Sequence, residues 1–474
     1  MRQYTQFYID GEWIDPAIAS SCDVINPADE SIAGVISLGS QADVDKAAAA
    51  ARAAFAAFAR FTPQERLELL QNILASYEQH YDEIALAISE EMGAPLPFAR
   101  EEQAACGSSH LQSAISALKN FQFVEDKGST RVYKEPIGVC AFITPWNWPL
   151  NQITCKVAPA IATGCTMILK PSEIAPFSAY LFAQVMEEAG VPAGVFNMIN
   201  GDGPTVGAAM AAHPEVDMVS FTGSTRAGIL VAKAAADTVK RVTQELGGKS
   251  ANIILDDADL ETAVSGGTLS CFSNSGQSCN APTRMLVPAA LHDEAVAIAV
   301  NTANAVVVGE PEAEGTDIGP VVSKLHFDQI QKLIQQGIDE GTELVVGGTG
   351  KPANLDKGYY VRPTIFANVD NSSTIAQQEI FGPVLAIIPY QDDAEAIRIA
   401  NDTPYGLCAY VSGSEARVLA TAAQLRSGMV QLNGDEGSFD APFGGYKQSG
   451  NGREFAEYGF EDFLELKAVM GIEI

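Results

Sequence analysis

Cys279 has the most distinctive setting for chemistry in this sequence, the segment SNSGQSCN at 273–280. Its neighbours are small polar residues and a glycine, whereas structural cysteines such as Cys140 and Cys165 lie among aliphatic residues. A free thiol is only a few per cent thiolate at neutral pH, and nearby positive charge or backbone dipoles raise that fraction. The pattern makes Cys279 a candidate nucleophile, but these residues alone leave a non-catalytic cysteine open.

Glu245 is the candidate general base, at the start of the segment ELGGK at 245–249. It ends an expected buried strand over 239–245, and the paired glycines after it would let the chain pass close to another group. Burial raises the pKa of a carboxyl group and makes it a usable base near neutrality. A solvated acid at the end of a strand is the alternative.

The segment TPWNWP at 144–149 holds a candidate oxyanion donor, Asn147. Its two prolines stiffen a loop that follows an expected strand over 137–143. A rigidly held amide N–H is the kind of group that stabilises an oxyanion. A capped loop without chemistry is the alternative.

Three further segments could hold a dinucleotide. GDGPTVG at 201–207 has one residue too many for the usual fingerprint, and an ordinary turn explains it as well. FTGSTRAG at 221–228 runs from a buried strand into a helix, which suits a pyrophosphate, although an ordinary helix cap also fits. In KPSE at 170–173, Lys170 and Glu173 could hold ribose hydroxyls, and the acid would repel a 2′-phosphate, favouring NAD over NADP.

The elements expected around these segments predict an α/β protein. A helix begins with Thr62 as N-cap and a capping box closed by Glu65, and ends near Gly93. From 137 to 245, β-branched runs alternate with helical segments, which indicates a parallel sheet covered on both faces. A second such stretch covers about 251–445. Ligands of parallel sheets bind beyond the carboxyl ends of the strands, where the candidate residues stand. The segment 121–136 is polar and extended, and we expect it to be an arm.

Composition excludes several classes of function. The 474 residues include 29 Lys and Arg against 59 Asp and Glu, a net charge of −30, which argues against binding to nucleic acids or membrane surfaces. No CxxC pair, signal-peptide layout or membrane-spanning stretch is present, so a cytoplasmic location is expected. The five histidines are scattered, and no metal site is predicted.

Seven motifs in this order resemble the aldehyde dehydrogenase superfamily across nearly the whole chain. They are PWNWP at 145–149, KPSE at 170–173, FTGST at 221–225, ELGGK at 245–249, GQSC at 276–279, EIFGP at 379–383 and PFGGYKQSG at 442–450.

The resemblance implies a role for each matching residue. Cys279 would attack the aldehyde carbon, and Asn147 with the Cys279 N–H would hold the oxyanion. Hydride transfer to NAD would leave a thioester, and Glu245 would activate the water that hydrolyses it. Lys156 matches a family position near the active site. The implied cofactor residues are Ile143, Thr144, Trp146, Lys170, Ser172, Glu173, Gly203, Phe221, Gly223, Ser224, Leu246, Glu379 and Phe381.

The implied substrate residues are Trp148, Ser278, Asn280, Asp435 and Phe443. The loop 435–440 is acidic, with Asp435, Glu436 and Asp440. If one of these carboxylates points inward, it would repel a carboxylate-bearing aldehyde and favour a cationic or neutral one; solvated acids are the alternative. Trp148 offers an aromatic wall, so aromatic or medium-chain aldehydes are plausible substrates.

The resemblance also implies the architecture. A Rossmann-like NAD-binding domain would cover 1–118 and 139–247, and a second parallel-sheet α/β domain, the catalytic one, 248–454. A small β oligomerisation arm would cover 119–138 and 455–474, giving a dimer or homotetramer. Two other functions stay open: an enzyme that passes the acyl group to coenzyme A, and a non-catalytic binding protein on the same scaffold. Every role requires that Cys279 and Glu245 reach one narrow passage.

Overall fold

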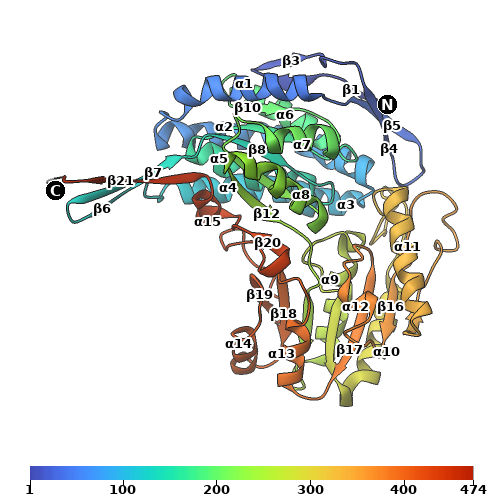
Figure 1. Ribbon diagram of the computed structural model, residues 1–474. Helices are drawn as coiled ribbons and strands as arrows, with labels where there is room; N and C mark the ends of the chain where they lie inside the picture. Colours follow the sequence, from blue (N-terminus) through green and yellow to red (C-terminus); the bar gives the residue numbers. More distant parts are fainter. Residues whose placement is uncertain (473–474) are drawn as a thin grey trace.

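The computed structural model describes residues 1–472 and contains two α/β bodies, with an arm that projects from the first (Figure 1). Within these residues each body has one large sheet with parallel strands at its centre. The α/β fold expected from the alternating pattern is therefore confirmed, as is the arm as a separate β element.

The first sheet has the strand order β20-β12-β11-β8-β9-β10-β2-β3. Its five central strands, β12 to β10, are parallel, and β20, β2 and β3 are antiparallel additions at the edges. The bounds are β2 Phe7–Ile9, β3 Glu12–Ile14, β8 Val139–Ile143, β9 Thr166–Lys170, β10 Phe196–Met198, β11 Met218–Thr222, β12 Arg241–Glu245 and β20 Gly450–Asn451.

The register of the parallel strands aligns the residues that matter for function. Lys170 pairs with Ile143, Ile143 with Phe221, and Thr222 with Glu245. Four neighbouring strands therefore end at the same edge of the sheet, where loops turn into helices and ligands of such sheets bind.

Helices cover both faces of this sheet. They are α1 Gln41–Phe58, α2 Pro63–Met92, α3 Leu96–Phe98, α4 Ala105–Leu118, α5 Pro149–Thr163, α6 Phe177–Glu188, α7 Ala208–Ala212, α8 Thr225–Ala235 and α15 Ala456–Glu461. The predicted ends of α2 are confirmed: Thr62 and Glu65 form the capping box, and Gly93 closes the helix with a φ of 78°. A wider π-helical turn leads into α4 and another into α7, Ala99–Ala104 and Gly203–Gly207.

The second sheet has the order β15-β16-β17-β14-β13-β18-β19, and β15 alone among these strands is antiparallel to its neighbour. Its strands are β13 Ala251–Ile254, β14 Arg284–Pro288, β15 Glu343–Val346, β16 Thr364–Ala367, β17 Val384–Tyr390, β18 Cys408–Ser412 and β19 Met429–Leu432. Its helices are α9 Leu260–Phe272, α10 His292–Ala305, α11 Lys324–Asp339, α12 Thr374–Gln377, α13 Asp393–Asn401 and α14 Glu415–Ala422.

Two small sheets complete the fold. Near the N-terminus β1 Arg2–Tyr4, β4 Ser21–Ile25 and β5 Ile32–Ser37 form a sheet that the sequence pattern did not indicate. The arm consists of β6 Val124–Lys127, β7 Thr130–Pro136 and β21 Leu464–Met470, all antiparallel (Figure 1).

The C-terminal segment departs from the expected boundaries. β20 lies within the predicted catalytic range but joins the first sheet, where Asn451 pairs with Gln244. The helix α15 lies within the predicted arm, yet Phe460 and Phe463 are buried in the core of the first body, so the arm strand begins only at Leu464. The helix α15 packs against α4 and α5, and the burial of its apolar side chains holds it against the first body. Residues 473–474 of the predicted arm lie outside the described residues.

Candidate active site

A cavity of about 580 Å³ opens at the carboxyl edge of the first sheet, between the two bodies. The first body contributes Trp146 and Asn147 after β8, Gly223 and Ser224 after β11, and Glu245 at the end of β12. The second body contributes Cys279, Glu379 and Phe381. The structure therefore brings the candidate nucleophile, base and oxyanion donor to one cavity.

Cys279 is carried by a tight loop after α9. Asn274, Ser275 and Gly276 all have positive φ, between 53° and 74°. A Cβ on Gly276 would lie 2.1 Å from the backbone of Gly382, so the loop requires glycine there. The Asn274 amide fastens this loop to the first body by donating hydrogen bonds to the carbonyl oxygens of Asn147 and Gln277.

The paired glycines of the ELGGK segment serve two close approaches. A Cβ on Gly248 would lie 2.2 Å from the Cys279 carbonyl oxygen, and one on Gly247 would lie 2.3 Å from Glu379 Oε2. Neither position could carry a side chain without displacing a group that lines the cavity. The sequence indicated a close approach here but not its partners.

The Cys279 thiol is partly exposed to the cavity. Burial raises the pKa of this thiol, and the nearby carboxyl groups of Glu379 and Glu245 raise it further. These surroundings therefore favour the thiol over the thiolate.

Glu245 is buried, with 4% of its surface exposed, and neither carboxyl oxygen has a hydrogen-bond partner among residues 1–472. Burial and repulsion by Glu454 raise its pKa well above the usual value, while Lys156 and Arg453 oppose the rise. An unpaired buried carboxyl group beside a cavity is suited to exchanging a proton with a bound water.

Lys156 forms a buried ion pair with Glu454. The charge of Glu454 raises the pKa of Glu245, and the charge of Lys156 lowers it. Lys156, predicted to lie near the active site, therefore influences the protonation of this carboxyl group.

Asn147 is also buried, and its Nδ2 donates to the Gln277 carbonyl oxygen at 3.0 Å. An amide nitrogen carries two hydrogens, so one remains for an oxyanion formed near Cys279.

The cavity has the features of a dinucleotide cradle. Ser224 caps α8, an eleven-residue helix whose N-terminus borders the cavity beside Gly223, and such N-termini attract phosphate. Glu379 accepts a hydrogen bond from Gly248 N at 2.9 Å, and burial raises its pKa to about 7. Trp146 packs edge-on against Phe381, with ring centroids 5.5 Å apart.

The remaining predicted cofactor residues lie near this edge without all lining the cavity. Lys170 Nζ donates to the carbonyl oxygens of Pro171 and Gly201 and to Glu173 Oε2 at 3.1 Å. Burial lowers the pKa of Lys170. Leu246 lines the cavity. The predicted cofactor residues that do not line it are Ile143, Thr144, Lys170, Ser172, Glu173, Gly203 and Phe221.

A second cavity, of about 480 Å³, meets the first at Cys279 and Gln152, which line both. Trp148, Asn280 and Phe443 line it as predicted for substrate residues. Ser278 lies beside it and accepts a hydrogen bond from Trp148 Nε1 at 2.8 Å. Cys279 thus stands where a cavity suited to a dinucleotide meets one with aromatic walls.

Asp435 does not line this second cavity. Its carboxylate turns back on its own loop, where it accepts a hydrogen bond from Gly437 N at 2.7 Å, and it borders a different cavity. The neighbouring Glu436 lines the cavity that contains Cys279. Of the three acids considered in this loop, Glu436 is therefore the one that lines the cavity containing Cys279, and it also borders the cavity beside Asp435.

Several lining residues were missed by the sequence interpretation: Cys106, Asn151, Gln152 and Phe455. Asn151 and Gln152 belong to the first turn of α5, directly after the TPWNWP loop, and that proximity was a usable signal. Cys106 and Phe455 carry no local signal, because they reach the cavity only through long-range packing.

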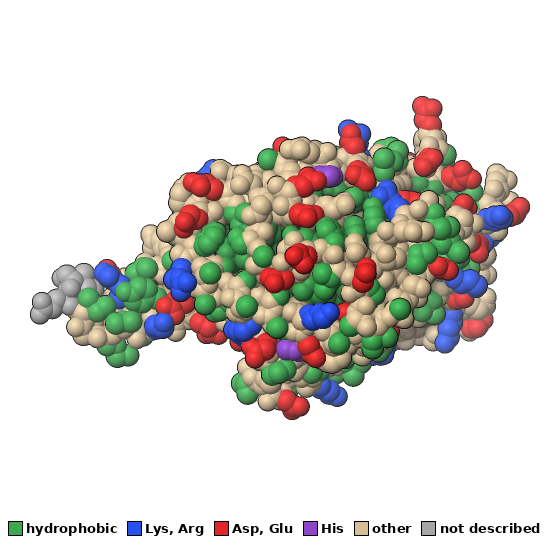
Figure 2. Space-filling model, turned by 90° about the horizontal axis from the view of Figure 1, so that it is seen from above, with side chains coloured by type: hydrophobic (Ala, Val, Ile, Leu, Met, Phe, Trp, Pro, Cys, Tyr) green, Lys and Arg blue, Asp and Glu red, His purple; other side chains and the backbone are tan. Residues whose placement is uncertain are grey.

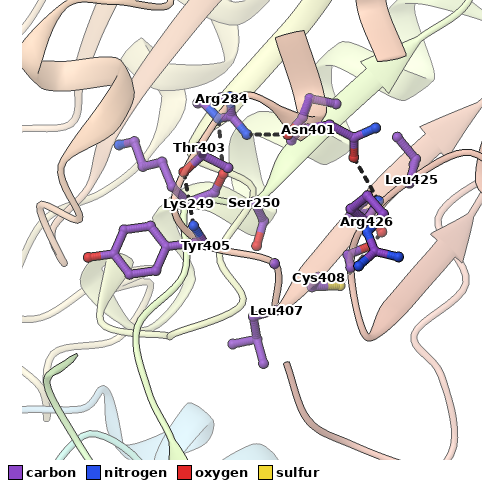
Figure 3. Close-up of a pocket in the computed structure, with 15 residues that line it drawn as sticks. Lys249, Ser250, Arg284, Asn401, Thr403, Tyr405, Leu407, Cys408, Leu425 and Arg426 are labelled. Atoms are coloured by element: carbon purple, nitrogen blue, oxygen red, sulfur yellow. Dashed lines mark hydrogen bonds between the residues drawn. The ribbon is translucent and has the colours of Figure 1, made fainter. Parts of the chain in front are cut away.

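A third, small cavity of about 20 Å³ lies behind the ELGGK segment (Figure 3). Arg284 is fully buried there and donates to the carbonyl oxygens of Lys249, Ile399 and Ala400. Figure 3 shows this guanidinium beside Lys249 and Asn401. The hydrogen bond to Lys249 attaches the ELGGK segment to β14 of the second sheet.

Among residues 1–472, no group of three or more His, Cys, Asp and Glu side chains is arranged to hold a metal ion. None of the helices in this range has the length and apolar character needed to span a bilayer.

Comparisons with known proteins agree with this geometry. Residues 13–469 match the model of the aldehyde dehydrogenase family. A 3-succinoylsemialdehyde-pyridine dehydrogenase from Pseudomonas sp is 59% identical, over the whole of both chains. A mutant of aldehyde dehydrogenase C from Pseudomonas syringae, crystallised with NAD⁺ and octanal, is 51% identical, with a TM-score of 0.98 over 99% of this chain and 97% of that chain. An aldehyde dehydrogenase from Bartonella henselae is 50% identical, with a TM-score of 0.98 over the whole of both.

The acidic surroundings of Cys279 generate a prediction about its reactivity. Glu379→Gln removes a negative charge that raises the thiol pKa, so labelling of Cys279 by iodoacetamide at pH 8 should become about three to ten times faster. Peptide mass spectrometry after timed labelling measures the rate. Glu294→Gln, on the exposed face of α10, is the matched control and should leave the rate unchanged. Equal rates in both variants would contradict the electrostatic explanation.

Proposed function

Because the chain belongs to the aldehyde dehydrogenase family, and is thus an aldehyde-oxidising enzyme, we propose that it makes the carboxylic acid with NAD through a thioester on Cys279. The observation that carries the proposal is the position of Cys279 at the junction of the two cavities, with Glu245 and Asn147 beside it. NAD use is supported by the P. syringae structure with NAD⁺ and by the phosphate-suited N-terminus of α8. Glu173, at the edge beyond β9, disfavours the 2′-phosphate of NADP.

The first half of the proposed reaction uses Cys279 and Asn147. The Cys279 thiol gives its proton to solvent in the cavity, the sulfur forms a bond to the aldehyde carbon, and the electron pair of the broken C–O π bond makes the carbonyl oxygen an oxyanion. Asn147 Nδ2 and the Cys279 backbone N–H stabilise that charge. NAD, when bound, accepts the hydride that leaves this carbon with its electron pair. The carbon is then held on Cys279 as a thioester.

The second half uses Glu245. Its carboxylate takes a proton from water while the water oxygen attacks the thioester carbon. The carbon–sulfur bond then breaks, sulfur leaves as thiolate, and the carboxylic acid departs. The raised pKa of Glu245 makes its carboxylate a stronger base than an exposed glutamate.

Glu245 also argues against transfer of the acyl group to coenzyme A. An enzyme whose acceptor is a thiol has no need of a base for water, whereas this cavity holds an unpaired, buried carboxyl group. Formation of the acid without coenzyme A would support hydrolysis.

The substrate class follows from the second cavity. Trp148, Phe439, Phe443 and Phe455 give it aromatic walls, suited to an aromatic or medium-chain aldehyde. Glu436 lines it and places negative charge at its wall. A neutral or cationic aldehyde is favoured. The relative named for a pyridine semialdehyde and the octanal complex agree with apolar or aromatic substrates.

The arm supports self-association into a dimer or tetramer. It projects from the body (Figure 2), and Leu466 and Met470 on β21 are 71% and 77% exposed. A thin sheet with exposed apolar residues is stabilised when a second copy covers it. A reducing cytoplasm suits the eight cysteines, all of which are free thiols, and the acidic surface disfavours nucleic acid as a partner.

Replacement of the two catalytic candidates should separate the halves of the reaction. Cys279→Ala should abolish NADH formation from octanal, whereas Cys106→Ala, which removes the other thiol lining the substrate cavity, should retain most of it. Glu245→Gln should give one equivalent of NADH rapidly and then turn over at least a hundredfold more slowly, because the thioester persists. Stopped-flow fluorescence of NADH and mass spectrometry of the acylated protein measure both effects.

The pH dependence follows from the same assignment. Glu245 acts as a base, so steady-state turnover should rise with pH through its raised pKa and then level off. Glu245→Gln should lack that rise. A Glu245→Gln variant with normal steady turnover, or one that needs coenzyme A to turn over, would remove Glu245 from this role.

Charge at the cavity should control the choice of substrate. Glu436→Gln should raise kcat/KM for a carboxylate-bearing aldehyde about two- to fivefold relative to octanal, the size expected of an exposed charge pair. Asp435→Asn makes the same charge change in the same loop, but outside this cavity, and should leave the ratio unaltered. The two variants are compared by initial rates of NADH formation; equal ratios would exclude a role for Glu436.

The arm should determine the oligomeric state. Leu466→Asp should shift the dissociation of the oligomer to at least tenfold higher protein concentration, because it places a charge in the covered surface. Leu325→Asp, on α11, alters a residue that is also 71% exposed and should leave the assembly intact. Size-exclusion chromatography with light scattering measures both, and identical profiles would rule out the arm as the contact.

A further inference from the structure

One side of the substrate cavity is polar. Asn151, in the first turn of α5, lines the cavity within an otherwise aromatic wall. Its Oδ1 lies 2.6 Å from Nε2 of His110 on α4. An amide oxygen can only accept a hydrogen bond, so the imidazole N–H is the donor. The oxygen of the amide is thereby occupied, and the Nδ2 hydrogens have no partner among residues 1–472.

His110 is fixed from two sides. Its ring lies edge-on to Phe439, at 4.8 Å between centroids, and is tilted against Phe455 at 4.4 Å. Burial lowers the pKa of His110 to about 4, so at neutral pH the ring is uncharged and carries a single N–H. That hydrogen is donated to Asn151 Oδ1, and this hydrogen bond fixes the orientation of the amide before any ligand binds.

The same face of α4 holds the loop that closes the cavity. Ser113, one helical turn after His110, donates to the Phe439 carbonyl oxygen and to Asp440 Oδ1, each at 2.9 Å. The hydrogen bonds from Ser113 therefore hold Phe439 in place against the His110 ring. The amide of Asn151 is a preorganised hydrogen-bond donor in an aromatic cavity.

Resting on the proposed function, we propose that Asn151 selects uncharged aldehydes that carry a hydrogen-bond acceptor, such as a ketone carbonyl, in addition to an aromatic ring. The aromatic walls take the ring, and Nδ2 of Asn151 donates to the acceptor. His110 is a positioning residue that acts through Asn151. A site built to donate a hydrogen bond discriminates against an analogue without the acceptor, because the donor then loses its partner. Asn151 is only half-buried, so water replaces part of that loss.

The test compares two aldehydes that differ by one carbonyl, 4-oxo-4-phenylbutanal and 4-phenylbutanal. For the unaltered enzyme, kcat/KM should be about tenfold higher for the keto-aldehyde. Asn151→Leu keeps the size of the side chain and removes the donor, and should bring the ratio close to one by raising KM for the keto-aldehyde, with kcat little changed. The midpoint of thermal unfolding and the KM for NAD should stay unaltered, which shows that the variant is folded and still binds the cofactor.

His110 is tested by the same ratio. His110→Phe preserves the ring packing but removes the N–H, and should lower the ratio by at least threefold, while His110→Gln, which can donate again, should restore part of it. A purely structural role would lower both rates together and leave the ratio unaltered. An unchanged ratio in Asn151→Leu would overturn the inference while leaving the proposed function standing. Absence of NADH from every aldehyde, octanal included, would overturn the proposed function itself.

Discussion

The close approach of two chain segments at Gly248 and the Cys279 carbonyl oxygen is the contact on which the site depends. The two segments come from different bodies, and no side chain fits between them. The same approach places Glu245, three residues earlier, and the Cys279 thiol on one cavity. Position 444 also requires glycine, because a Cβ on Gly444 would lie 2.7 Å from Oε1 of Glu245. Glycine at these points keeps open the space that water and substrate require.

The electrostatic setting of the thiol follows from this crowding. Burial raises the pKa of Cys279 most, and the charges of Glu379, Glu245 and Glu454 raise it further. Lys156 is already paired with Glu454. The surroundings of Cys279 therefore favour its protonated form, and a protonated thiol reacts more slowly with electrophiles than a thiolate does.

Local patterns in the sequence were sufficient for the parallel sheets, the α2 caps and the loops that hold Cys279, Glu245 and Asn147. These features depend on neighbouring residues, such as Thr62 with Glu65, or on strand ends that share one sheet edge. What failed depended on distant contacts. His110 meets Asn151 across 41 positions, and α15 packs against α4 and α5 from the C-terminus. No periodicity encodes such contacts, since they arise only when separate elements pack.

The pairing of β20 with β12 means that the last part of the chain completes the sheet that the first part begins. The edge of β12 that carries Glu245 is covered only after residues 450–451 have been synthesised, and α15 then adds Phe460 to the same core. The first body is therefore not a continuous module that could be cut out or exchanged between proteins by a single crossover. During translation, the first body has to wait for the second before its catalytic edge is closed.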